Sequence, residues 1–176
     1  MRRARETGMN TTITQDEFAA SDREGATIST ILGSCVATCL WDPVAKVGGM
    51  NHILVAHTGT GATRSDLAGI NAMELVINAM IRLGASRGNL RAKVFGGAKM
   101  ISGLSDIGLG NGRFALDFLE REGIPCLGHS LGGTAARQVR FYPAEGRVMM
   151  KLVSAAPEVL RPRPLAEPRC NDVELF

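Results

Sequence analysis

The sequence of 176 residues has no long hydrophobic run and few aromatic residues, and each shortage excludes a class of protein. No apolar stretch approaches the roughly 20 residues that a membrane-spanning helix needs, so we expect no insertion into a membrane. Aromatic residues make up 5% of the chain, with one tryptophan and one tyrosine, and the net charge is only +3. A nucleic-acid groove needs a concentrated basic stripe with stacking aromatics, and we therefore expect no nucleic-acid partner.

Motifs for metals and nucleotides are also missing. No pair among the cysteines has the Cys-x-x-Cys spacing of a zinc site. No Gly-x-Gly-x-x-Gly turn follows a strand-like segment, which argues against a dinucleotide fold. The basic start of the chain leads into polar residues rather than an apolar segment, unlike a secretory signal. We therefore expect a cytoplasmic protein with reduced thiols that needs neither a metal nor an organic cofactor.

Hydrophobic periodicity predicts more strands than helices. Strands are predicted over residues 27–31, 35–41, 47–56, 90–95, 137–142 and 147–153, the last two forming a hairpin. Apolar residues at spacings of three and four predict an amphipathic helix from about Asp66 to Gly84. Asn111 is interpreted as the N-cap of a second helix. Because no β-α-β unit repeats, this order indicates a mixed α+β domain.

Composition divides the chain into three segments. Residues 1–24 are polar and are interpreted as a leader, whereas residues 25–154 contain the predicted elements and form the catalytic domain. Prolines are dense after residue 154, and their fixed φ angles are incompatible with a continuing helix or a central strand. Residues 155–176 are therefore predicted to be a tail rich in proline and arginine.

Cys35 is the strongest candidate for chemistry. It follows a bend at Gly33 and Ser34, and such a bend exposes a nucleophile while leaving backbone N–H groups free to hold an oxyanion. His52 lies on the next predicted strand, and the short turn at residues 42–46 returns it toward the thiol. We therefore expect a nucleophile–base pair at one edge of these two strands.

Each of these residues also has a structural interpretation. A cysteine is among the commonest buried residues, and Cys39, inside a predicted strand with no bend beside it, is assigned to the core. In the corresponding interpretation, His52 is a strand histidine whose ring nitrogens only form hydrogen bonds within the fold. His57 and His129 are rivals for the base, but both adjoin glycine-rich segments typical of turns or surface.

Short sequence blocks between Thr27 and Lys151 carry a family resemblance. They are Leu32-Gly33-Ser34-Cys35-Val36 with Trp41-Asp42-Pro43, Gly48-Gly49-Met50-Asn51-His52, Lys93-Val94-Phe95-Gly96-Gly97-Ala98, Ile107-Gly108 with Asn111, and Gly132-Gly133 with Arg137. In this order the blocks resemble the chemoreceptor glutamine deamidase family, CheD.

The resemblance implies a three-layer α/β/β sandwich with mixed β-sheets, like that of toxin-type cysteine deamidases. It implies Cys35 as the nucleophile and His52 as the general base of an amidohydrolase acting on glutamine side chains of proteins. The family's third residue is a threonine just upstream of the cysteine. Counting without gaps places Ser29 there, and a one-residue shift places Thr30; Ser29 is preferred by register and Thr30 stays open. Backbone N–H groups near Gly33 and Ser34 would hold the oxyanion.

The implied substrates are methyl-accepting chemotaxis receptors, whose glutamines would become glutamates through a cysteine thioester during chemotaxis adaptation. One alternative is a binding module without catalysis, docking to receptors or to a CheC-type phosphatase. Another is a cysteine amidase that acts on a free small molecule. Replacement of Cys35 separates the catalytic interpretations from the binding module.

Overall fold

The computed structural model describes residues 8–55, 64–100 and 107–153. Within them the chain forms nine strands, two α-helices and one short 3-10 helix. Their order is β1 (Asn10–Thr12), β2 (Phe18–Ser21), β3 (Thr27–Leu32), β4 (Val36–Asp42), β5 (Val47–Asn51), α1 (Arg64–Arg82), η1 (Arg87–Asn89), β6 (Arg91–Gly96), α2 (Ile107–Arg121), β7 (Cys126–Leu131), β8 (Ala136–Tyr142) and β9 (Arg147–Val153).

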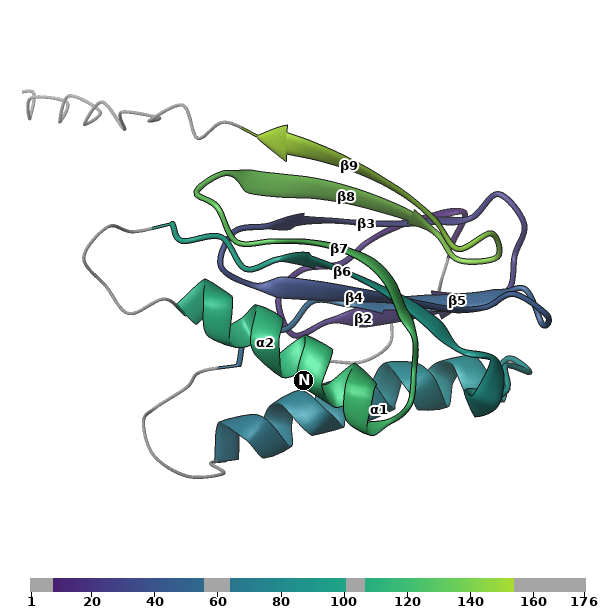
Figure 1. Cartoon of the computed structure of the whole chain (residues 1–176). Helices are drawn as coiled ribbons and strands as arrows, with labels where there is room; N and C mark the ends of the chain where they lie inside the picture. The colour runs from purple at the N-terminus through teal and green to yellow at the C-terminus, as the bar shows by residue number, and fades with distance from the viewer. Residues whose placement is uncertain (1–7, 56–63, 101–106, 154–176) are drawn as a thin grey trace, which may run out of the picture.

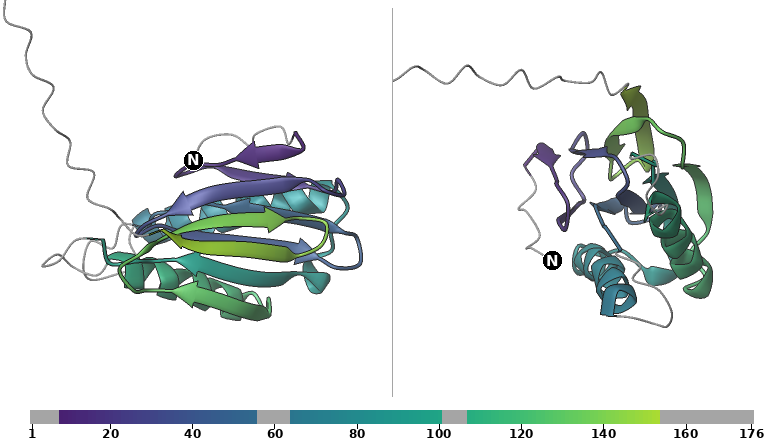
Figure 2. Two further views of the ribbon diagram at one scale, coloured as in Figure 1. Left: turned by 90° about the horizontal axis from the view of Figure 1, so that it is seen from above. Right: turned by 90° about the vertical axis from the view of Figure 1, so that its left-hand side faces the viewer.

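The elements are stacked in three layers (Figure 1). The strands form a four-stranded sheet of order β1-β3-β8-β9 and a five-stranded sheet of order β2-β5-β4-β6-β7. Both sheets are mixed, because β1 runs parallel to β3 and β6 parallel to β7 while the other pairs are antiparallel. The helices cover one face of the five-stranded sheet, as the end view in Figure 2 shows. The predicted α+β fold with mixed sheets is confirmed.

Two separate cores hold the layers together. Residues of α1 and α2 pack on one face of the five-stranded sheet, around Val36, Leu40 and Met73. The opposite face packs on the four-stranded sheet, where Cys39 and Met50 meet Phe141. Because successive side chains of a strand point to opposite faces, β4 supplies both cores and is buried along its whole length.

The predicted amphipathic helix corresponds to α1. Met73, Ile77 and Met80 are fully buried, whereas Leu67 at the start of the predicted stripe is 66% exposed. The helix therefore packs mainly through its second half. Within the described residues no helix is both long enough and apolar enough to cross a membrane.

One end of the inter-sheet layer is closed around Trp41. The β8–β9 turn crosses this ring so closely that a Cβ at Gly146, whose φ is +67°, would collide with the indole. Lys93 Nζ lies 5.0 Å from the ring centroid and donates a hydrogen bond of 3.0 Å to the Gly146 carbonyl. The turn at Gly146 thus connects the four-stranded sheet to the five-stranded sheet through its contacts with Trp41 and Lys93.

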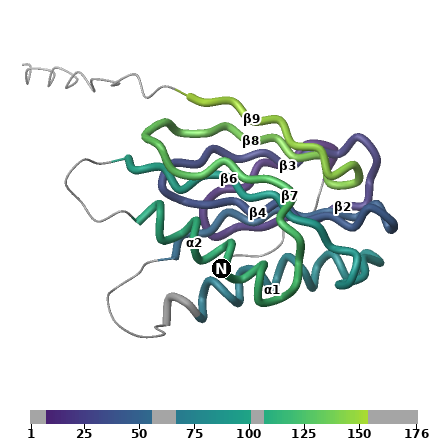
Figure 3. Tube along the Cα trace, viewed as in Figure 1, coloured from purple at the N-terminus to yellow at the C-terminus, as the bar shows by residue number. Residues whose placement is uncertain are grey.

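Regular strands begin earlier in the chain than its composition indicates. Residues 10–12 and 18–21, within the segment 1–24 interpreted as a leader, form β1 and β2. The chain crosses from one sheet to the other between them, and Figure 3 traces the path. These strands are short and are flanked by polar residues, so hydrophobic periodicity does not predict them. The predicted tail, 155–176, lies outside the described residues.

The N-cap assignment of Asn111 is wrong. Helix α2 begins at Ile107, so Asn111 lies inside it and is fully buried. The polar side chain is held there by distant backbone groups, described below, rather than by the end of its own helix.

Candidate functional site

Cys35 and His52 lie on the same face of a strand pair. Beyond the regular β4–β5 ladder, Val36 and Ile53 form an isolated antiparallel bridge in which each N–H donates to the other's carbonyl, at 3.0 and 2.8 Å. The bridge continues the register in which Cys39 pairs with Met50. In this register position 35 is a diagonal neighbour of position 52, and such neighbours on one face lie within reach of long side chains.

Both side chains belong to the layer between the sheets. Cys35 packs against the inter-sheet core and is only partly buried, because it sits at the bend before β4. His52 is 6% exposed and contacts the opposite sheet through Thr30 of β3. The rival His129 lies on β7, paired with Val94, and His57 lies outside the described residues.

Thr30 fixes the His52 ring. Its hydroxyl donates to the Ile13 carbonyl at 2.8 Å and lies 2.8 Å from His52 Nδ1. A hydroxyl has one proton to donate, so with that proton on Ile13 the oxygen accepts from Nδ1–H. This assigns the proton to Nδ1 and leaves Nε2 with a free lone pair, as a general base requires.

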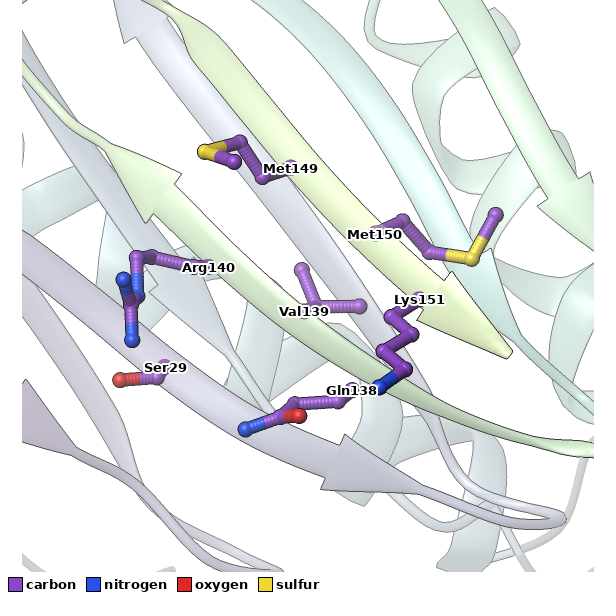
Figure 4. A pocket seen from close by; sticks show the side chains of 7 residues that line it. All are labelled: Ser29, Gln138, Val139, Arg140, Met149, Met150 and Lys151. Atoms are coloured by element: carbon purple, nitrogen blue, oxygen red, sulfur yellow. The ribbon is translucent and has the colours of Figure 1, made fainter. Parts of the chain in front are cut away.

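The preferred Ser29 lies on the other side of the sheet. Neighbouring side chains of β3 point to opposite faces, so Ser29 lines a shallow outer pocket with Gln138 and Arg140 (Figure 4). Of the two hydroxyls left open by the sequence, the structure brings Thr30 and not Ser29 to the imidazole. The alternation of side chains along the strand distinguishes the two hydroxyls in the sequence itself, because Thr30 shares its face with the buried Ile28 and Leu32.

Burial and charge set the resting protonation states. Burial raises the pKa of the Cys35 thiol and the nearby Asp16 charge raises it further, while the N–H of Cys35 itself acts in the opposite direction. Burial lowers the pKa of His52, against smaller opposing effects of Asp16 and Glu17. Near neutral pH the pair is therefore a thiol beside a neutral imidazole, not a preformed thiolate–imidazolium pair. A thiol in this state becomes nucleophilic only when a base removes its proton.

The bend before β4 is held by its carbonyl groups. The carbonyl of Gly33 accepts from Ala98 N–H at 2.9 Å, and that of Cys35 accepts from Gly97 N–H at 2.8 Å. Between these, Ser34 O accepts from Asn111 Nδ2 at 2.8 Å. In the part of the chain that the structure describes, the Ser34 N–H has no acceptor. The bend is held through its carbonyl groups, and the Ser34 N–H is available as a hydrogen-bond donor.

Asn111 joins the two segments that carry Cys35 and His52. Its Nδ2 donates to Ser34 O, next to Cys35, and its Oδ1 accepts from Val55 N–H at 2.8 Å, just beyond His52. A buried amide that satisfies two backbone groups on different segments fixes the distance between them. Sequence reasoning placed Asn111 in a family block but gave it no role in the site.

Gly96 allows the bend to approach β6, and Gly97 allows Gly108 of α2 to approach the same segment. Both have positive φ, +114° and +65°, and a Cβ at Gly96 would collide with the Cys35 carbonyl. These two glycines therefore have the function of close backbone approach rather than only of a turn. The approach lets Gly97 N–H reach the carbonyl of Cys35.

The structure thus defines an α+β sandwich with a thiol, an imidazole and a hydroxyl at one end of its inter-sheet layer. The sequence matches the family described as CheD chemotactic sensory transduction over residues 55–152. A protein of Caulobacter sp. (strain K31) named probable chemoreceptor glutamine deamidase CheD is 46% identical over 171 residues, which cover 93% of this chain and 91% of the relative. The chain belongs to the CheD family.

Other similarities differ widely in extent. A relative of the same name from Agrobacterium fabrum is 45% identical over 93% of this chain and 94% of its own length. Among solved structures, the hypothetical protein YfiH of Bacillus licheniformis has a TM-score of 0.43 and 17% identity, covering 64% of this chain and 49% of that one. The sequence relatives extend over Cys35 and His52, which the family match at residues 55–152 does not include.

Proposed function

We propose that this chain is a chemoreceptor glutamine deamidase with Cys35 as nucleophile and His52 as general base. The name shared by relatives that are 44–46% identical supports the reaction and the substrate. The observation that carries the assignment of residues is the bond between Thr30 and His52 Nδ1, because it leaves Nε2 free beside a partly exposed thiol. Thr30 is a positioning residue in this proposal.

The reaction begins with attack of Cys35 Sγ on the amide carbon of a glutamine side chain. His52 Nε2 takes the thiol proton as the S–C bond forms, since the resting thiol is protonated. The amide oxygen becomes an oxyanion, which accepts hydrogen bonds from N–H groups of Ser34 and Cys35. The imidazolium then protonates the nitrogen, ammonia leaves, and a thioester remains on Cys35.

Hydrolysis completes the cycle. His52, neutral again, takes a proton from a water molecule that attacks the thioester carbon. The S–C bond breaks, the proton returns to the sulfur, and the substrate leaves with a carboxylate. The net change is one glutamine and one water converted to one glutamate carboxylate and one ammonium ion, because the new carboxyl group gives its proton to the released ammonia. The thiol proton and one proton of the water pass through His52, so this scheme needs no cofactor.

Mass spectrometry of a receptor cytoplasmic fragment tests the proposal. Incubation with the wild type should convert specific glutamines to glutamates, and incubation with Cys35→Ala should not. Cys126→Ala is the matched control, because Cys126 pairs with Ala92 at the other end of β6 and should leave activity intact. Deamidation by Cys35→Ala would contradict the assignment of the nucleophile.

The same variant tests the binding-module alternative. Full restoration of chemotaxis by Cys35→Ala in a deletion strain would favour docking to receptors or to a CheC-type phosphatase over catalysis. We place the reaction in the cytoplasm, as the sequence predicts. Turnover of free glutamine analogues without any receptor would instead favour a small-molecule amidase.

A further inference from the structure

The turn at residues 14–17 is fastened to the backbone of His52. Asp16 N–H donates to His52 O at 2.8 Å, and His52 N–H donates to Glu17 O at 3.0 Å. The Glu17 carboxylate closes the turn by accepting from the N–H and the hydroxyl of Thr14, at 2.8 and 2.9 Å. The turn is therefore a fixed part of the site.

Gln15, in the same turn, reaches the Cys35 thiol. Gln15 Oε1 accepts from Cys35 Sγ at 3.8 Å, a long contact that places the turn beside the nucleophile. The turn thus touches both reactive residues, one through the backbone of His52 and the other through the side chain of Gln15.

Asp16 brings a negative charge to this position. It is exposed, and its φ of +64° is a left-handed conformation that aspartate and asparagine tolerate better than most residues. Its charge acts on both Cys35 and His52. Among the residues that the structure describes, no lysine or arginine forms an ion pair with it.

We propose that Asp16 is a specificity-determining residue that favours neutral side chains at Cys35 and repels carboxylates. The inference rests on the proposed function, in which a neutral amide enters and an anionic glutamate leaves. A carboxylate beside Cys35 meets the like charge of Asp16, whereas an amide does not. Asp16 therefore promotes release of the product and opposes rebinding of sites that are already converted.

Alkylation of Cys35 measures this discrimination without a receptor. Iodoacetamide and iodoacetate have similar size and differ in charge. Each forms one S–C bond with Cys35, releases iodide and leaves the thiol proton to the buffer. We take the alkylation rate with iodoacetamide divided by the rate with iodoacetate, and we divide this ratio by the same ratio for free cysteine. The result reports repulsion of the anion at the site. Any change in the thiol's own reactivity alters both rates and cancels in the ratio.

Asp16→Asn should lower this ratio by about threefold to tenfold, as expected for an exposed, solvent-screened charge. Asparagine accepts the left-handed backbone, so the turn should persist. Asp22→Asn is the matched control. It removes the same charge just beyond β2, whose last residue Ser21 pairs with Gly48 at the end of β5 remote from His52. High salt should lower the wild-type ratio toward that of Asp16→Asn.

A ratio unchanged in Asp16→Asn, or lowered equally by Asp22→Asn, would overturn the proposal, because the discrimination would then not come from Asp16. A Cys35 that neither reagent modifies would overturn both this proposal and the proposed function. A lowered ratio in a protein that deamidates no receptor glutamine would leave the charge discrimination standing and refute only the deamidase function.

Discussion

The two ends of strand β4 differ in how their polar groups are satisfied. At one end, Asp42 is fully buried, and Oδ1 accepts from the N–H groups of Val44 and Ala45 at 2.8 and 3.0 Å. Its Oδ2 accepts from Ser86 N–H at 2.8 Å. Burial alone would raise the pKa of Asp42, but the Ser86, Ala45 and Val44 N–H groups hold it below its ordinary value. Both carboxylate oxygens of Asp42 therefore accept hydrogen bonds from backbone N–H groups.

At the other end, the network is incomplete. Thr30 satisfies only Nδ1 of His52, and the carbonyl of Ser34 is bound while its N–H is not, within the described residues. Saturated polar groups stabilise a fold, whereas buried or half-buried groups with a remaining donor or acceptor are available to a substrate. The comparison predicts that substitutions at the Asp42 end change stability alone and that those at the Cys35 end change activity as well.

Among the residues that act on Cys35, the largest effect is expected for His52→Ala. Loss of the base should lower kcat by about 10²–10⁴-fold, the usual contribution of general acid–base catalysis. In the wild type, the pKa of His52 is lowered from its ordinary value of about 6.5, so the imidazole stays neutral at that pH. Activity should therefore fall only when the pH drops below about 6.5. Deamidation kinetics across pH measure both quantities. A variant with normal kcat would contradict the role of His52.

Thr30→Val should have the next largest effect. The change keeps the shape but leaves His52 Nδ1–H and the Ile13 carbonyl without partners, so we expect kcat to fall about 10–100-fold. Thr30→Ser should recover most of the loss, and ¹⁵N spectra of the ring should show mixed tautomers only in Thr30→Val. Ser29→Ala is the matched control on the opposite face, and an equal loss there would argue against a positioning role for Thr30.

Asn111→Ala acts at the junction of the two segments. It leaves Ser34 O and Val55 N–H unpaired, which should cost about 1–3 kcal/mol of stability for each buried group. We also expect a loss of kcat near tenfold, because Cys35 and His52 are no longer held at a fixed separation. Asn78→Ala, on the exposed face of α1, should change neither. Chemical denaturation and deamidation rates compare the two variants, and an unchanged kcat in Asn111→Ala would leave it a purely structural residue.

Asp42→Ala should leave kcat unchanged and lower the free energy of unfolding by about 2 kcal/mol, because buried N–H groups lose a charged acceptor. The folded-state pKa of Asp42 is lowered, so its contribution is complete above the unfolded-state pKa of about 3.9 and is lost as the pH falls toward the folded value. The difference between wild type and variant should therefore shrink in acid. Denaturation at several pH values tests this, and a constant difference would argue against the ionised carboxylate.

Local patterns were sufficient to predict much of the fold and part of the site. The β4–β5 pair follows from two strand-like segments around a short turn, and it brings position 35 near position 52. The choice of Ser29 over Thr30 relied on counting along the sequence, although strand alternation with the apolar Ile28 and Leu32 favours Thr30.

Other parts of the site depend on contacts that no local pattern contains. Asn111 bonds to Ser34, far away in sequence, and no periodicity identifies such a partner. The turn at residues 14–17 lies between two short strands in a polar segment, and only the tertiary fold brings it to His52. Sequence patterns therefore predicted the proximity of Cys35 and His52 better than the groups that surround them.

The packing of Trp41 beneath the turn at Gly146 gives the protein an internal optical reporter. Trp41 is the sole tryptophan of the chain and is 7% exposed. Its fluorescence emission should shift to longer wavelength when the two sheets separate and water reaches the indole. Circular dichroism follows the helical layer instead, so coincidence of the two unfolding curves would show that helices and sandwich melt as one cooperative unit.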